Sequence, residues 1–341
     1  MNESVNRRNF LLMVTGSVAG VAASPSGGIA RAGHSPSNRP PDPQFGNVTF
    51  DQPIITARRD FFAHTYKGEI PAINAADWSL TIDGLIDGAA RMFTWGELRG
   101  VASREDLRTI ACIGNPVGGA KIGNARFRGL SFADLLGRIR PEATHVKFTA
   151  ADGYQTAVPL EYVTHPDALL AYEMNGEPLS AEHGFPLRAL IPGVYGQKMP
   201  KWITHIEFID YPFQGYWESH GWSDSALVRT QATILTPTER ARIDGGIAVQ
   251  GIAFAGLREI TKVEIRVDGG EWMPANLLHE PSPLAWTQWY LDWLPEAPGT
   301  FAIEARATDS SGFTQHDDAP PPFSSRAGSD GIHRVVVEVV I

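Results

Sequence analysis

The sequence predicts a mixed α+β domain followed by an antiparallel β-sandwich. Between residues 48 and 227, alternating apolar and polar segments mix with short helical patterns and show no regular strand–helix–strand rhythm. From residue 228 onward, short alternating segments follow one another with turn signals between them. The 341 residues also exceed what one hydrophobic core usually serves. We therefore expect two folded domains, 48–227 and 228–341.

Composition narrows the class of protein. Hydrophobic residues make up 43% of the chain and charged residues 20%, as in an ordinary globular protein. The net charge of −9, without a long basic run, argues against nucleic-acid binding and against adhesion to an anionic membrane. Cys112 is the only cysteine, so no intrachain disulfide can form, and cysteine patterns for zinc or haem are absent.

The first 33 residues have the order of an export signal. Arg7-Arg8 precedes an apolar run from Phe10 to Ala23, and a polar, Pro/Gly-rich stretch follows. The paired arginines are typical of a twin-arginine signal, which exports proteins that have already folded, and predict a periplasmic location. The alternative is a basic N-terminus before a short hydrophobic anchor. Residues 34–47 are expected to form a linker.

The first domain contains strand and helix patterns in alternation. Strands are expected at 77–84, at the segment ending in Cys112, and at 145–150, 156–160, 169–174 and 201–208. A short helix is expected to start near Phe93. Ser131 is a plausible N-cap for a second helix. Asn175-Gly176 is the two-residue hairpin signal.

The second domain is predicted to be all β. Its expected strands are 246–254, 260–267, 286–293, 299–309 and 334–341. Nothing in it looks catalytic.

Cys112 lies where a strand meets a glycine-rich loop that contains Gly114, Gly118 and Gly119. Glycines allow the backbone to approach a ligand closely, so this placement is typical of a binding site. The competing interpretation is a small, buried apolar cysteine, which is the commoner fate of a single thiol. The local sequence leaves both open.

The order of motifs along the first domain resembles the sulfite oxidase family of molybdopterin enzymes. The motifs are Phe-Phe-x-His at 61–64, Trp-x-Leu-x-Ile-x-Gly at 78–84, Cys-x-Gly-Asn at 112–115, Asp-Gly-Tyr at 152–154, Ala-Tyr-Glu-Met-Asn-Gly-x-Pro-Leu at 171–179, His-Gly-Phe-Pro-Leu-Arg at 183–188 and Lys-Trp-Ile at 201–203. The C-terminal sandwich is similar to that family's immunoglobulin-like dimerisation domain, which implies a possible homodimer.

This resemblance implies one molybdenum held by the dithiolene of one molybdopterin, with the Cys112 thiolate as its protein ligand. A soft thiolate suits such a metal. The positions that it assigns to the cofactor are Phe62, His64, Cys112, Asp152, His183, Arg188, Met199 and Lys201. Taken singly, Arg188 and Lys201 are as well explained by surface ion pairs, and His64 by a hydrogen-bonded core histidine.

The sequence departs from the family beside the cysteine. Pro116-Val117 stands where sulfite oxidases have two arginines, one of which faces the sulfite. Arg126 or Arg128 is the candidate to supply the missing charge. Trp222 or His220 is the candidate to replace an expected tyrosine. We therefore predict that Cys112, Arg126 and Trp222 are catalytic residues.

The resemblance implies two-electron oxo transfer, with sulfite or a related small sulfur compound as the default substrate. Reduction of a sulfoxide or another S- or N-oxide is the alternative, because a less cationic pocket suits neutral substrates. A cofactor-free binding or assembly module is the alternative of another class. No haem-binding segment is visible, so electrons are expected to be exchanged with a separate carrier such as a c-type cytochrome.

Overall fold

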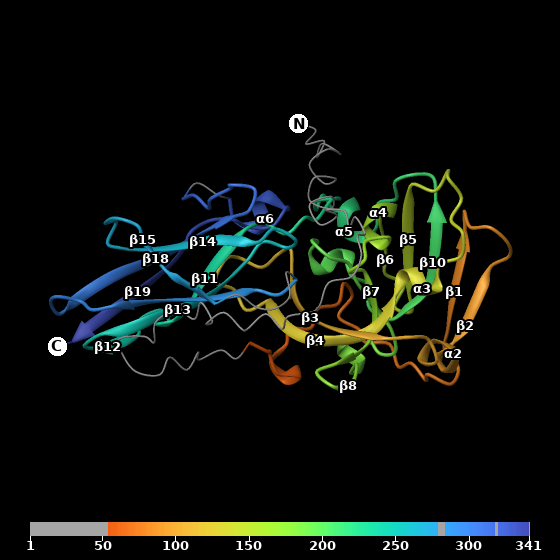
Figure 1. The fold of residues 1–341 in the computed structure, drawn as a ribbon, viewed down its shortest axis with the longest axis horizontal. Coiled ribbons are helices and arrows are strands. Elements are labelled where there is room, and N and C mark those ends of the chain that lie inside the picture. The colour runs from red at the N-terminus through yellow and green to blue at the C-terminus, as the bar shows by residue number, and fades with distance from the viewer. Residues whose placement is uncertain (1–53, 279–283, 318–319, 341) are drawn as a thin grey trace, which may run out of the picture. The chain divides into compact units, whose positions relative to one another are not determined.

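The computed structural model describes residues 54–278, 284–317 and 320–340 (Figure 1). The predicted signal and linker lie outside the described residues. Strands dominate the fold, and none of the described helices exceeds five residues. The helical segments are η1 (Arg58–Asp60), α2 (Trp95–Arg99), α3 (Phe132–Leu135), α4 (Leu160–Val163), η2 (Ala181–His183), η3 (Gly196–Lys198), α5 (Tyr216–Ser219) and α6 (Pro322–Ser325). In the described part of the chain, no helix is long and apolar enough to span a membrane.

The first sheet has the strand order β2-β1-β10-β5-β6. Its strands are β1 (Ser79–Gly84), β2 (Arg91–Thr94), β5 (His145–Ala150), β6 (Gln155–Pro159) and β10 (Ile203–Ile209). β1 and β10 run parallel, and the other pairs are antiparallel. Thr94 ends β2 and starts α2 through a reciprocal capping box with Glu97, which explains the predicted helix start.

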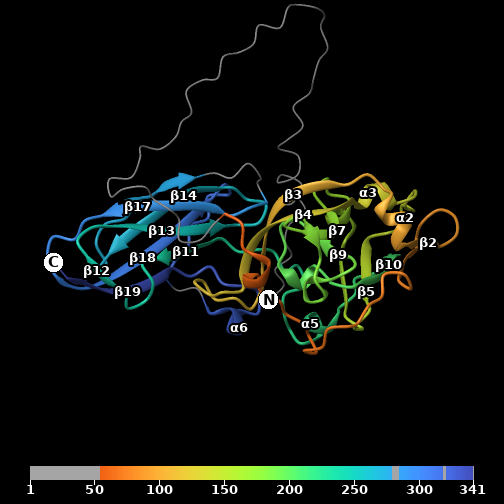
Figure 2. The ribbon, with the colours of Figure 1, turned by 90° about the horizontal axis from the view of Figure 1, so that it is seen from below.

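The second sheet is antiparallel (Figure 2), and Cys112 directly follows one of its strands. Its strands are β3 (Arg104–Ala111), β4 (Ile122–Ser131), β7 (Leu169–Met174), β8 (Glu177–Pro178) and β9 (Arg188–Leu190), with β9 paired to β7. Asn175 and Gly176 join β7 to β8 with φ angles of 53° and 81°, as the hairpin signal predicts.

The ten-residue strand β4 was not expected, because its glycines and asparagine are typical of a loop. The glycines serve close packing instead. A Cβ on Gly123 would lie 2.7 Å from the Phe61 ring, and one on Gly129 would lie 2.2 Å from the Leu170 carbonyl oxygen. At the end of β4, the Ser131 hydroxyl accepts a hydrogen bond from the Ala133 N–H, which confirms the predicted N-cap of α3.

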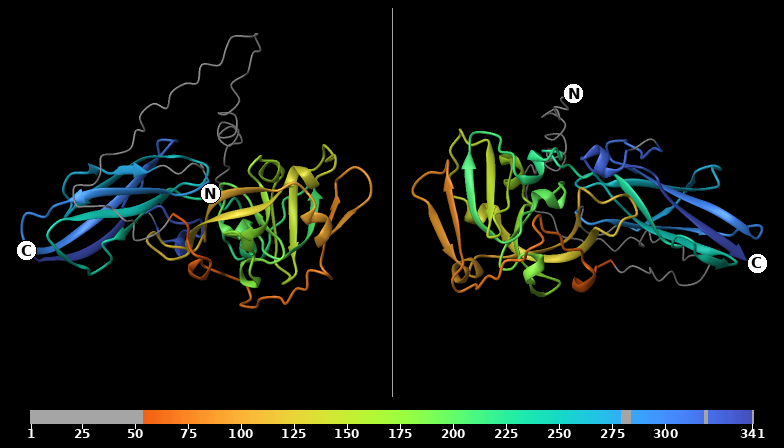
Figure 3. Two further views of the ribbon diagram at one scale, coloured as in Figure 1. Left: turned by 60° about the horizontal axis from the view of Figure 1, so that its bottom comes forward. Right: turned by 180° about the vertical axis from the view of Figure 1, so that it is seen from behind.

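Strands β11 to β19 form two further sheets, with the orders β11-β13-β17-β16 and β12-β19-β18-β14-β15 (Figure 3). Their bounds are β11 (Gln231–Thr236), β12 (Arg242–Asp244), β13 (Ile247–Phe254), β14 (Ile260–Val267), β15 (Met273–Pro274), β16 (Asn276–Leu278), β17 (Thr287–Trp293), β18 (Gly299–Asp309) and β19 (His333–Val340). Val263, Trp289, Ile303 and Val337 lie in one buried core that both sheets share. All five predicted strands are present, and the sandwich is confirmed. The boundary at 227/228 stays a prediction.

A buried ion pair fastens the chain just before β11 to the sandwich. The fully buried carboxylate of Asp309 accepts a hydrogen bond from Arg258 Nε at 2.7 Å and another from the Thr230 hydroxyl. Arg258 also donates to the Val228 carbonyl at 2.9 Å. Removing the carboxylate would leave a largely buried guanidinium without its charged partner.

We predict that Asp309→Ala lowers the free energy of unfolding by about 3–5 kcal/mol, the usual cost of breaking a buried pair. Denaturant unfolding measures this. The matched control is Asp317→Ala, whose carboxylate is 63% exposed and pairs with Arg266 at 3.4 Å. An exposed pair contributes less than about 1 kcal/mol. Equal losses in the two variants would contradict the assigned role of Asp309.

Candidate active site

Cys112 directly follows β3 and Lys121 directly precedes β4, so the two residues face each other across this antiparallel pair. The Cys112 N–H donates to the Lys121 carbonyl at 2.9 Å, which extends the ladder beyond Ala111 and Ile122. The buried side chain of Asn115 closes the intervening loop, since its Oδ1 accepts from the Lys121 N–H at 2.8 Å. The local fold therefore holds Cys112 and Lys121 side by side.

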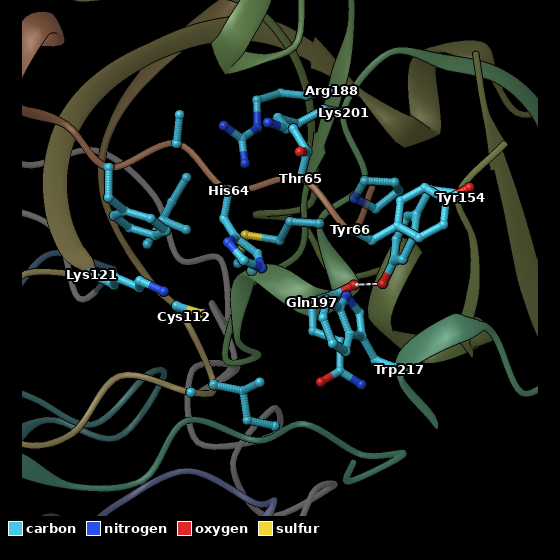
Figure 4. A pocket seen from close by; sticks show the side chains of 18 of the residues that line it. His64, Thr65, Tyr66, Cys112, Lys121, Tyr154, Arg188, Gln197, Lys201 and Trp217 are labelled. Atoms are coloured by element: carbon cyan, nitrogen blue, oxygen red, sulfur yellow. Dashed lines mark hydrogen bonds between the residues drawn. The ribbon is translucent and has the colours of Figure 1, made fainter. Parts of the chain in front are cut away.

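A cavity of about 200 Å³ opens beside the Cys112 thiol (Figure 4). Its walls come from the segment 61–66, the end of β3, the turn at 152–154, the run from η2 to residue 202, and the segment that includes α5. Of the ten predicted site residues, nine line it: Phe62, His64, Cys112, Asp152, His183, Arg188, Met199, Lys201 and Trp222.

Arg126 does not line the cavity, and this expectation is corrected. It lies in the middle of β4, where successive side chains alternate between faces. Phe127 is buried, whereas Arg126 and Arg128 are exposed. Arg128 approaches Glu173 at 3.5 Å and so is no substitute. His220 is exposed and packs on Tyr216, so of the two candidates to replace the tyrosine only Trp222 reaches the cavity.

Arg188 is the strongest electrostatic feature of the cavity. It begins β9, and its guanidinium is buried with one hydrogen bond, from Nη1 to the His183 carbonyl at 3.2 Å. Its Nε has no hydrogen-bond partner, and no carboxylate among the described residues pairs with it. Burial lowers the pKa of Arg188 to about 10, so it remains charged at neutral pH. A buried cation without a charged partner is energetically costly, and an anion bound beside it would remove that cost.

Lys201 adds a second cation beside Arg188. Its Nζ donates to the Glu182 carbonyl at 2.7 Å. Burial, reinforced by the charge of Arg188, lowers the pKa of Lys201 to about 7, although Asp152 and Glu182 act in the opposite direction. Burial also lowers the pKa of His183. Arg188 therefore keeps its positive charge at neutral pH while Lys201 is only partly protonated, and an anion bound there would favour the charged form of Lys201.

The chemistry around Cys112 is different. Burial raises the pKa of the thiol, while a hydrogen bond from the Gly114 N–H and the charge of Lys121 oppose that rise. His64 is partly buried, and burial together with the charges of Lys121 and Lys201 lowers its pKa. Its imidazole is therefore neutral at neutral pH. In the protein alone Cys112 favours the thiol form, and a bound metal would deprotonate it.

Aromatic rings form the wall near Cys112. His64 stacks on Trp217 with ring centroids 6.0 Å apart, Trp222 contacts Trp217 at 6.2 Å, and Phe323 contacts Trp222 at 5.6 Å. Trp217 lies on α5, and the next residue, Glu218, forms a buried ion pair with Lys198 at 2.5 Å. That pair fixes the element that carries the aromatic wall.

Several residues of the cavity were not predicted from the sequence. The pairing of β3 with β4 places Lys121 opposite Cys112, so Lys121 could have been predicted only if β4 had been recognised as the partner of β3. Phe323 comes from α6, in the part of the chain where nothing looked catalytic, and no local pattern marks it. Tyr154 also lines the cavity, and its buried hydroxyl donates to the Gln197 carbonyl at 2.7 Å.

A family model described as "Oxidoreductase molybdopterin binding domain" matches residues 67–217. The mitochondrial sulfite oxidase of Drosophila melanogaster is 29% identical over 320 residues, which cover 81% of this chain and 56% of the fly protein. The Arabidopsis thaliana sulfite oxidase is 28% identical over 344 residues, or 82% of this chain and 87% of the plant protein. An uncharacterised oxidoreductase of Bacillus subtilis is 30% identical over 182 residues, covering 52% of this chain and 87% of that protein. The chain thus spans little more than half the length of the fly relative.

Among solved structures, the sulfane dehydrogenase SoxCD from Paracoccus pantotrophus is similar, with a TM-score of 0.67 and 23% sequence identity. The match covers 80% of each chain. It shows that the two chains share a fold.

We predict that sulfate binds cofactor-free protein more weakly as pH rises through about 7, the pKa of Lys201. Sulfate keeps its charge in this range, whereas Lys201 loses its proton and its attraction for the anion. Isothermal titration calorimetry between pH 6 and pH 8 measures the change. Lys201→Arg keeps a charge throughout and should remove the decline. An identical decline in both proteins would contradict this assignment.

Proposed function

Because this chain belongs to the sulfite oxidase family of molybdopterin-dependent oxidoreductases, we propose that it catalyses two-electron oxo transfer on a small sulfur compound, with sulfite as the default substrate. The observation that carries the proposal is one cavity with a thiol at one end and, at the other, the buried guanidinium of Arg188, which pairs with no carboxylate of the described residues, beside the ammonium of Lys201. Such an arrangement suits an anionic cofactor that reaches from the cations to the thiol.

The residues present fit the cofactor of the family, Mo-molybdopterin. Arg188 and Lys201 offer donors for its phosphate, and Arg188 Nε is an unused buried donor. The carboxylate of Asp152 can accept hydrogen bonds from the amino groups of the pterin. His183 and the backbone at Met199 complete this end of the cavity.

Cys112 is the residue that would hold the metal. The described residues contain no group of three or more His, Cys, Asp or Glu side chains able to bind a metal ion. A metal at this site therefore needs ligands that the cofactor brings, with one thiolate added by the protein. When bound, the cofactor supplies the redox chemistry, and the chain supplies position and charge.

Two features of the chain act near the reacting atoms. The neutral imidazole of His64 has a ring nitrogen that can accept a proton from water. The rings of Trp217 and Trp222 give the space beside Cys112 an apolar wall, which strengthens the electrostatic interactions there. Both features suit a reaction that uses water as the oxygen source.

Support for sulfite comes from the names of the animal and plant relatives. The alternative, reduction of a sulfoxide or another S- or N-oxide, is favoured by the absence, in the described part of the chain, of an arginine at the thiol end, where Arg126 was expected and Lys121 is the cation present. We also propose twin-arginine export to the periplasm, supported by Arg7-Arg8 before the apolar run. Replacing both arginines by lysine should leave the protein in the cytoplasm, and continued export would contradict this route.

We further propose that the electrons pass to a separate carrier, such as a c-type cytochrome, and that the sandwich serves as an immunoglobulin-like dimerisation domain. The first proposal predicts reduction of added cytochrome c by substrate-reduced enzyme. The second predicts the mass of a dimer by light scattering. An unreduced cytochrome, or the mass of a single chain, would contradict the respective proposal.

The test of the proposed function uses protein expressed with added molybdate. We expect about one molybdenum per chain, released with a pterin fluorophore on denaturation. Stopped-flow absorption should then show bleaching of the oxidised centre by sulfite. Metal-free protein from a competent host would support the cofactor-free binding module. A loaded centre that sulfite does not bleach, but that dimethyl sulfoxide reoxidises after reduction, would support the reductase.

We predict that Cys112→Ser lowers turnover by more than about 100-fold, because even outer-shell partners of a metal contribute about 10–100-fold. Steady-state assays with ferricyanide as electron acceptor measure the loss. The melting temperature should stay close to that of the wild type, since serine has nearly the same size. A purified variant with full activity would show that Cys112 is not the metal ligand.

A further inference from the structure

The thiol end of the cavity contains two groups to which the proposed chemistry gives no task. One is the ammonium of Lys121, and the other is the ring of Phe323. They come from distant parts of the sequence: Lys121 directly precedes β4, and Phe323 lies on α6. Together they define the kind of molecule that this end of the cavity can take.

Lys121 supplies one positive charge close to the thiol. Figure 4 shows its side chain extending toward Cys112. Its Nζ forms no hydrogen bond or ion pair with any residue in the described ranges, so its charge is available to a ligand. The same charge acts on both Cys112 and His64. Lys121 therefore provides the cation that Pro116-Val117 does not.

Phe323 supplies an apolar surface close to the same point. Its side chain is 69% exposed although it lines the cavity. A Cβ on Gly114 would lie 3.4 Å from the Trp222 ring and 3.5 Å from the Phe323 ring, so this aromatic surface begins two residues after Cys112. An exposed aromatic ring at the mouth of a cavity is a typical contact for an apolar group.

Two hydrogen bonds made by Arg326 position the helix that carries Phe323. Arg326, at the end of α6, donates from Nη1 to the His220 carbonyl at 2.6 Å. The Arg326 carbonyl accepts from the Ser223 N–H at 2.8 Å. These bonds join α6 to the segment that carries Trp222, so Phe323 and Trp222 present one surface.

We propose that the substrate of this site is a small organic sulfinate, R–SO₂⁻, whose oxygens bind Lys121 and whose apolar R group contacts Phe323 and Trp222. This inference rests on the proposed function and names its substrate class. A single ammonium matches the single charge of a sulfinate, and the aromatic surface matches the R group. Sulfite has no carbon substituent and leaves that surface unused.

The reaction balances as R–SO₂⁻ + H₂O → R–SO₃⁻ + 2 H⁺ + 2 e⁻. One sulfur–oxygen bond forms, the carbon–sulfur bond stays intact, and the sulfur is oxidised. Two equivalents of a one-electron acceptor take up the two electrons, and ferricyanide serves as that acceptor in the assay. The protons leave to solvent.

The binding test uses the loaded enzyme and two unreactive products, methanesulfonate and benzenesulfonate, measured by calorimetry. Wild-type enzyme should bind benzenesulfonate more tightly. Lys121→Gln should weaken both ligands by about tenfold or more, as expected for the loss of a charged contact. Phe323→Ala should weaken only benzenesulfonate, by severalfold. The two variants thus give different patterns that a general loss of structure would not produce.

Matched controls test charge and apolar surface outside the cavity. Arg126→Gln removes an exposed cation from β4, and Met92→Ala removes an apolar side chain that is 68% exposed on β2. Neither control should change the affinity for either sulfonate. Lys121→Arg should retain binding.

The kinetic test compares kcat/KM for benzenesulfinate and sulfite, with ferricyanide as acceptor. We expect the larger value for the sulfinate, and a selective loss of that value in Phe323→Ala. An enzyme that contains molybdenum and is reduced by sulfite, but shows equal affinity for both sulfonates or no effect of Lys121→Gln, would overturn this inference and leave the proposed function standing. Absence of molybdenum would overturn the proposed function itself.

Discussion

The buried guanidinium of Arg188 is the constraint on which the site depends. A charged group out of water is costly unless an opposite charge accompanies it, and among the described residues no carboxylate does so. Lys201 lies beside it and increases the positive potential. The fold brings together β9, η2 and the segment before β10 to form this cluster, and the cluster is satisfied only by an anion in the cavity. The positive charge of this cluster is therefore balanced only when the anionic cofactor is bound.

The thiol end of the cavity depends on the second half of the chain as much as on the first. Gly118, in the loop after Cys112, has a φ of 81° and packs so closely on His333 that a Cβ would lie 2.0 Å from Nε2. Its N–H donates to the Thr233 hydroxyl at 3.2 Å. Phe323 approaches from the same half. The sandwich strands therefore support the loop that carries Cys112, in addition to any role in assembly.

Much of the fold follows from local sequence patterns that each predict one element. The alternation at 145–150 and 260–267, the helix start expected near Phe93 and the hairpin pair Asn175-Gly176 each led to the observed element. The strand β4 did not, because its glycines allow tight packing against Phe61 and Leu170 while looking like turn residues. That one omission explains the error at Arg126, whose side chain lies on the outer face of the strand.

The candidate site likewise contains residues that the sequence predicts and residues that only the structure reveals. His183, Arg188 and Lys201 were found because they stand in an ordered set of motifs, and the structure brings them into one cavity. Lys121 depended on a strand pairing that the sequence did not reveal. Phe323 lies more than 200 positions after Cys112, and only the tertiary structure brings it near. Contacts between distant segments carry no local pattern, so Lys121 and Phe323 could not be predicted as neighbours of Cys112.

X-ray absorption at the molybdenum edge tests the central claim most directly, because it counts the sulfur ligands of the metal. We expect the molybdenum of wild-type protein to have one sulfur ligand more than that of Cys112→Ser protein loaded with the same cofactor. An equal number of sulfur ligands in the two proteins would contradict the assignment of Cys112 as the residue that binds the metal.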